Sequence, residues 1–97
     1  MPTDNEIVLV AMQKIQNPRK WTKGGLVKGA RMCAWQALRE ASPDYETLMR
    51  IGHKFRLAMY GARQLTTSNF HPLIRFNDHP DTTHEEVIEL FKKVADS

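Results

Sequence analysis

Four histidines are the side chains in this sequence best suited to acid–base catalysis or metal binding, because imidazole titrates near neutral pH and ligates transition metals. Their densest grouping with carboxylates is Asp78-His79-Pro80-Asp81, followed by His84-Glu85. Zinc sites built from local sequence show tighter Cys/His spacing, and no cysteine lies near this segment. A turn that leads into a helix explains the same residues, since carboxylates are favourable at a helix N-terminus. We therefore predict no metal site and no bound cofactor.

The signals for a nucleophile and for a phosphate loop are weak. Cys33, the single cysteine, falls between Ala30 and Ala37 on the apolar side of a predicted helix, where a free cysteine behaves as a small hydrophobe. Residues 23–26 resemble the end of a phosphate loop only loosely, because the first glycine is missing and no strand is predicted before them. Amides at this point could still hold an anion. The sequence favours a protein without catalytic activity.

Cations accompany aromatic side chains on two predicted helical surfaces, one around Trp35 and the other around Tyr60. The candidate binding residues are Lys28, Arg31, Trp35, Arg39, Arg56, Tyr60 and Arg63. Such surfaces suit nucleic acids or nucleotides, through phosphate pairing and base stacking. Tryptophan with arginine is equally typical of protein–protein hot spots. A third interpretation, in which Trp35 packs into the core, stays open because large aromatic residues are rarely left bare.

Four helices are predicted to position these residues, which gives an all-α fold, a compact bundle. The first begins at a capping box, Thr3 with Glu6, and stops before Pro18. The second covers about residues 26–41, whose apolar positions share one arc at helical spacing. The third has Ser42 as its N-cap and extends to about residue 65. Residues 70–76 are predicted to be extended or irregular, residues 77–81 form a turn, and a second capping box at Thr83 begins the last helix.

Composition indicates one domain, residues 1–97, because natural domains cluster near this length. The hydrophobic fraction of 41% and the charged fraction of 26% are ordinary for a folded protein. A single cysteine excludes an internal disulfide and favours a reducing compartment. The N-terminus lacks the basic region of a signal peptide, and the first apolar run is too short to cross a bilayer. We expect a cytoplasmic protein that does not associate with membranes.

The net charge of +3 is unevenly distributed along the chain. Residues 19–75 contain eleven cations and three acids, a net of +8, while the N-terminal and C-terminal flanks carry −1 and −4. A basic middle segment suits an anionic partner. The acidic C-terminal segment could equally fold back and neutralise it, and charge blocks in small helical domains are often only solvated faces.

Short motifs stand in order along the chain: Trp21-Thr22-Lys23-Gly24, Cys33-Ala34 with Ala37-Leu38 and Ala41, Phe76-Asn77-Asp78, and Thr83-His84-Glu85-Glu86-Val87. Together they resemble an uncharacterised family of small bacterial and phage domains, over about residues 19–95. The resemblance implies a helical fold and a bacterial or phage source, and it assigns no activity. The chain departs from the family pattern in a shorter segment before Cys33 and in having Trp35-Gln36 after Cys33-Ala34.

Three hypotheses of function follow. The first is a non-catalytic binding module, self-associating or bound to a protein or to a small nucleotide-like anion; a phage-encoded counter-defence protein would be compatible with it. The second is a nucleic-acid-binding protein that uses the basic middle segment. The third is a small enzyme built on His53, His84 or Asp78, which requires these groups to converge.

Overall fold

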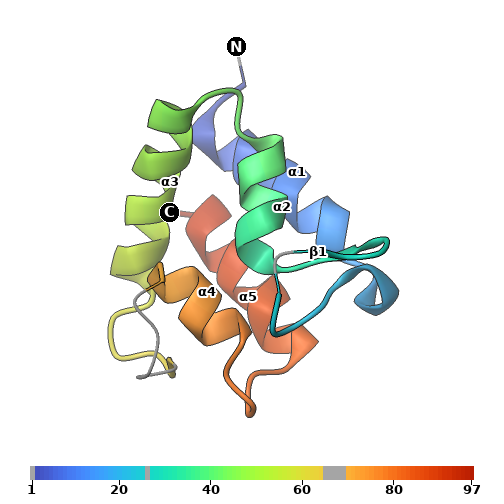
Figure 1. Ribbon diagram of the computed structural model, residues 1–97. Helices are drawn as coiled ribbons and strands as arrows, with labels where there is room; N and C mark the ends of the chain where they lie inside the picture. Colours follow the sequence, from blue (N-terminus) through green and yellow to red (C-terminus); the bar gives the residue numbers. More distant parts are fainter. Residues whose placement is uncertain (1, 26, 65–69) are drawn as a thin grey trace.

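The computed structural model describes residues 2–25, 27–64 and 70–97, and these fold into five α-helices, one short 3-10 helix and one two-stranded hairpin (Figure 1). The elements are α1 (Asp4–Ile15), η1 (Pro18–Lys20), β1 (Val27–Lys28), β2 (Arg31–Met32), α2 (Ala34–Ala41), α3 (Tyr45–Ala58), α4 (Pro72–Asn77) and α5 (His84–Ala95). Four of the helices are eight residues or longer. The predicted fold class, a mostly helical compact fold, is confirmed.

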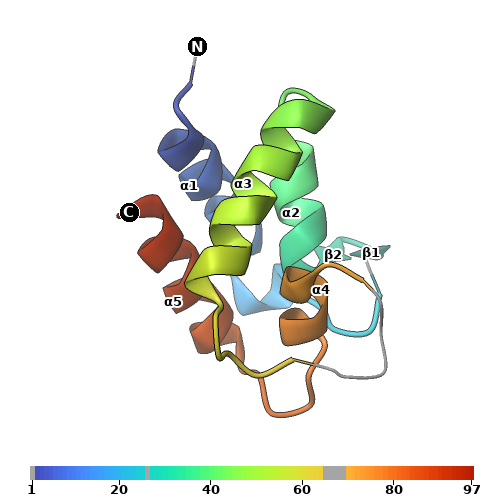
Figure 2. The same ribbon diagram turned by 90° about the vertical axis from the view of Figure 1, so that its left-hand side faces the viewer.

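The helices enclose one apolar core. α1 packs against both α2 and α5, and α3 packs against α5 and α4 (Figures 1 and 2). Phe55 of α3 meets Phe91 of α5 edge to face, with 4.9 Å between ring centroids, and neither ring is exposed. Ile15 and Leu38 bring α1 and α2 into the same fully buried cluster. No helix in the described part of the chain combines the length and hydropathy that crossing a bilayer requires.

The first and last helices begin where the sequence predicts, because their caps are local. The Thr3 hydroxyl accepts the amide proton of Glu6 at 3.1 Å. At α5, Thr83 accepts from the Glu86 amide, and the Glu86 carboxylate accepts from the Thr83 amide at 3.1 Å. These bonds satisfy amides that have no partner inside the helix.

The predicted second helix is wrong over its first half. Residues 27–32 form a hairpin in which Val27 faces Met32 and Lys28 faces Arg31, and Leu26 lies outside the described residues. Gly29, with φ +62°, takes the first position of the two-residue loop, which is where hairpin turns favour glycine. Helical spacing alone had placed Lys28 and Arg31 on one face with Trp35, whereas they belong to a different element.

The boundaries of the third helix also differ from the prediction. Asp44, not Ser42, is its N-cap and accepts from the Thr47 amide at 2.7 Å. The Ser42 hydroxyl instead donates to the Leu38 carbonyl at the end of α2. α3 ends at Ala58, followed by Gly61 at φ +80°, and residue 65 lies outside the described residues.

The segment predicted as extended or irregular is the helix α4. His71 is its N-cap, since its ring Nδ1 accepts the Leu73 amide proton at 3.0 Å. Pro72 stands at the first helical position, where its missing N–H costs nothing. The prediction failed because a helix of six residues is too short to show a periodic pattern.

We expect Phe55→Ala to lower the free energy of unfolding by about 3–5 kcal/mol, because it leaves a cavity against Phe91. Tyr60→Ala is the matched control, since the Tyr60 side chain is 96% exposed and should change stability by less than about 0.5 kcal/mol. Urea unfolding followed by circular dichroism measures both. Equal losses for the two variants would contradict the assignment of Phe55 to the core.

Candidate functional site

A cavity of 370 Å³ opens between the turn before the hairpin, the start of α2 and the helix α4. We call it the Trp35 pocket; its lining residues are Gly24, Gly25, Cys33, Trp35, Phe70, Ile74 and Asp78. A larger hollow along α5 is more open, and its Thr83 and Glu86 already serve the helix cap. The Trp35 pocket is the more enclosed of these two hollows, and we take it as the candidate site.

Trp35 lies partly in the core and partly in this pocket. Its ring stacks on His71, with 4.5 Å between centroids and an interplanar angle of 26°. Its six-membered ring also lies against Gly52, where an added Cβ would come within 3.4 Å of Cζ3. The half-buried indole thus packs on the core cluster and still forms part of the pocket wall. The sequence left two alternatives for Trp35, a place in the core or a place on the surface. In the structure the residue has both, since it packs on the core and lines the pocket.

His71 is held as a neutral imidazole. Its Nδ1 accepts the Leu73 amide proton, which leaves Nε2 to donate to the Gly52 carbonyl at 3.1 Å. Burial, with the positive charges of Arg56 and Arg75, lowers the pKa of His71 from 6.5 to about 4. Protonation would also remove the acceptor that caps α4. Sequence analysis missed this role, although a histidine directly before a proline is compatible with an N-cap.

Beneath the pocket, the buried Asn77 amide joins three segments. Its Oδ1 accepts from the Trp21 indole Nε1 at 2.6 Å and from the Ala34 amide at 3.0 Å. Its Nδ2 donates to the Thr22 carbonyl and to the Asp78 carboxylate, each at 3.0 Å. The side chain has no exposed surface and uses all of its hydrogen-bonding capacity.

Asp78 continues this network to the pocket wall. Its Oδ1 accepts from the Gly24 amide at 2.9 Å and from Asn77. Gly24 has φ +76°, a conformation that side-chain-bearing residues rarely adopt. Three of the sequence motifs, around Trp21, Cys33 and Asn77, therefore meet at this one place.

Cys33 is fully buried at the pocket and acts as the N-cap of α2. Its Sγ accepts the Gln36 amide proton at 3.4 Å. Burial raises the pKa of the Cys33 thiol above its ordinary value. The protonated thiol is a poor nucleophile, in agreement with the predicted apolar environment.

The structure separates most of the seven candidate binding residues. Lys28 and Arg31 face each other on the hairpin. The remaining cations and Tyr60 are exposed on α2, on α3 or beyond it: Arg39, Arg56, Tyr60 and Arg63. Lys28 does not line the Trp35 pocket, but its side chain lies beside Gly24 and Gly25, which form one wall of it. A Cβ on Gly24 would lie 3.7 Å from Lys28 Nζ, and one on Gly25 would lie 3.4 Å from Lys28 Cε.

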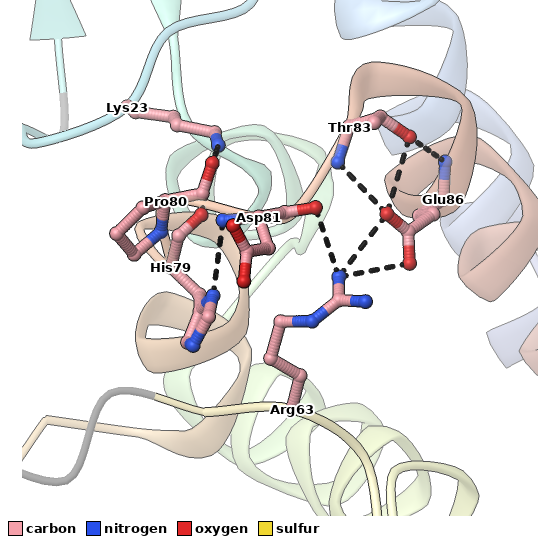
Figure 3. A network of polar contacts seen from close by, with 7 residues as sticks. All are labelled: Lys23, Arg63, His79, Pro80, Asp81, Thr83 and Glu86. Carbon is pink, nitrogen blue, oxygen red and sulfur yellow. Dashed lines mark hydrogen bonds and ion pairs between the residues drawn. The ribbon is translucent and has the colours of Figure 1, made fainter.

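Arg63 is engaged with the turn before α5. It donates to the Asp81 carbonyl at 3.1 Å and pairs with the Glu86 carboxylate at 3.0 Å (Figure 3). On the other side of the same turn, Lys23 Nζ donates to the carbonyls of His79 and Pro80 (Figure 3). These two cations stabilise the connection between α4 and α5.

The histidines and carboxylates singled out for chemistry do not line one cavity. His84 bonds to the Ile15 carbonyl at 2.7 Å and contacts Trp21, while His53 is exposed on α3. Neither residue lines the Trp35 pocket with Asp78. Within the described ranges, no three His, Cys, Asp or Glu side chains are placed to hold a metal ion.

The chain belongs to a family of unknown function (DUF6197), whose model matches residues 1–97. The resemblance to an uncharacterised family is thereby confirmed. No curated protein and no solved structure matches the chain significantly.

Replacing Asn77 by leucine should lower the free energy of unfolding by at least about 3 kcal/mol. The change replaces the amide by an apolar side chain of similar branching and leaves the Trp21 N–H, the Ala34 amide and the Thr22 carbonyl without partners, at about 1–3 kcal/mol each. Asn5→Leu, which removes only an exposed bond to the Ser97 carbonyl, is the control. Urea unfolding of both variants measures the difference, and similar small losses would refute the importance of the network.

Folding should become less favourable as the pH falls from 6.5 towards 4, because His71 then binds a proton only in the unfolded chain. Well above pH 6.5 the group is neutral in both states and contributes no pH dependence. We expect a loss of about 1 kcal/mol between about pH 7 and pH 5, after allowance for solvent screening of a half-buried ring.

The variant His71→Asn, which retains a capping acceptor, should lose this pH dependence. His53→Asn changes an exposed histidine and should retain it. The measurement is urea unfolding at a series of pH values. An unchanged profile in His71→Asn would show that another group is responsible.

Proposed function

We propose that this protein is a non-catalytic binding module for a small nucleotide-like anion, with the ring of the ligand in the Trp35 pocket and its phosphate at Lys28. The observation that carries the proposal is the position of Lys28, whose side chain lies beside Gly24 and Gly25 in the turn that forms one wall of the pocket. A cation at the rim of an aromatic-lined cavity suits a ligand that is apolar and planar at one end and negatively charged at the other.

The size and lining of the pocket support a small ligand. Its 370 Å³ falls within the range of about 300–1,000 Å³ that is usual for ligand cavities. Trp35 and Ile74 offer apolar contact, and stacking on a tryptophan suits any flat heterocycle. Asp78 adds one acceptor, because its Oδ2 has no hydrogen-bond partner among the described residues while Oδ1 is occupied. Ring N–H groups of a nucleobase are complementary to such an oxygen.

The groups beside the pocket support binding without chemistry. Cys33 is held as a thiol by burial, and its sulfur is already a helix cap. Both nitrogens of His71 are occupied by backbone groups of Leu73 and Gly52. Groups that are fixed in this way orient a ligand and neither give nor take protons near neutral pH.

Isothermal titration with the four common ribonucleoside monophosphates, their nucleosides and inorganic phosphate tests the proposal. We expect at least one nucleotide to bind at least about tenfold more tightly than its nucleoside, because only the nucleotide contacts Lys28. Lys28→Ala should remove that difference, and Trp35→Leu should weaken nucleotide and nucleoside alike.

Lys92→Ala is the matched control, because Lys92 is an exposed lysine of α5 outside the pocket. Circular dichroism melts verify that each variant is folded. The proposal fails if no nucleotide binds at millimolar concentration, or if Lys28→Ala and Lys92→Ala behave alike.

A further inference from the structure

The structure points to a ligand longer than one nucleotide: we infer that the Trp35 pocket receives one base of a single-stranded polynucleotide, whose neighbouring phosphates lie along the hairpin and η1. This inference rests on the proposed function and names the class of its ligand. It is carried by a second feature, a set of four exposed cations that we call the basic end: Arg19, Lys20, Lys28 and Arg31.

Backbone contacts place these four cations on adjacent elements. Lys28 and Arg31 are direct cross-strand partners in the hairpin. Trp21, which follows η1, forms a bridge to Met32, and the Thr22 amide donates to the Met32 carbonyl at 3.1 Å. The hairpin and η1 therefore lie side by side, and both project from the helices (Figure 1).

The basic end lacks compensating acids. The sequence contains no aspartate or glutamate from residue 7 to residue 39. Among the described residues, the ion pairs involve Arg50, Lys54, Arg63 and Lys92, and none involves the basic end. Like charges directly opposite each other on two strands destabilise a hairpin, so an anion that contacts both Lys28 and Arg31 would relieve their repulsion.

The combination of pocket and basic end favours a single strand. A mononucleotide has one phosphate, which Lys28 would satisfy, and Arg31, Arg19 and Lys20 would remain unused. A chain of nucleotides supplies regularly spaced phosphates to all of them. A base that enters the pocket must be unpaired, which favours a single strand, because a base inside a duplex would first have to be unstacked and flipped out. An acidic peptide would match the charges, but its carboxylates are not each accompanied by a flat ring as the phosphates of a nucleotide chain are.

Fluorescence anisotropy tests this inference. The affinity of a labelled single-stranded RNA of four nucleotides is measured directly, and that of the corresponding mononucleotide is measured by competition without a label. The oligonucleotide should bind at least about tenfold more tightly than the mononucleotide at low salt, and its affinity should fall as salt rises. The double variant Arg19→Ala/Lys20→Ala should weaken oligonucleotide binding about tenfold without changing mononucleotide binding. Its salt slope should decrease by about 1.4, at about 0.7 for each lost phosphate contact.

The double variant Lys92→Ala/Lys93→Ala removes the same charge from the C-terminal part of α5, which lies away from the hairpin (Figure 2), and should leave binding unchanged. Equal affinity for the oligonucleotide and the mononucleotide, or equal effects of the two double variants, would overturn the inference and leave the proposed function standing. Tighter binding of a duplex, or displacement by polyglutamate at equal charge concentration, would overturn it in favour of another polyanion. If neither form binds, the proposed function fails as well.

Discussion

The fully buried amide of Asn77 is the interaction on which the architecture around the pocket depends. Four hydrogen bonds from one side chain connect the end of α4 to the Trp21–Thr22 segment, to the start of α2 and to Asp78. An apolar residue of similar size would leave several of these groups unpaired in a region that water does not reach. The amide thus fixes the relative position of segments that have little apolar surface of their own.

This arrangement explains why the pocket consists largely of turns and helix ends. The caps of α2 and α4 are the side chains of Cys33 and His71, a thiol and an imidazole, where hydroxyl or carboxylate oxygens are more usual. Each of them also borders the pocket region, Cys33 as part of its wall and His71 by stacking on Trp35. Helix capping and the shape of the cavity therefore depend on the same side chains.

Local interactions made part of this structure predictable. The starts of α1 and α5 follow from bonds between residues three apart, and they were predicted correctly. The hairpin was missed because apolar residues on both sides of Gly29 also match helical spacing, which concealed the turn. The network of Asn77 joins residues 43 to 56 positions apart, so nothing local shows that the two ends of the pocket meet. The surface predicted around Trp35 is divided in the structure, because Lys28 and Arg31 belong to the hairpin whereas Arg39 lies with Trp35 on α2.

Folding pairs some cations of the basic middle segment with acids and leaves others without an acidic partner among the described residues. Arg50 and Lys54 pair with Asp4, whose pKa is lowered to about 2 chiefly by the Arg50 hydrogen bond. Arg63 pairs with Glu86, so the acidic C-terminal segment does neutralise part of the excess. The basic end receives no such partner within the described residues, although the same chain carries six acids after residue 75. Repulsion between the cations of the basic end opposes folding to a small extent. A bound polyanion would remove this repulsion, and the free energy gained would add to its binding.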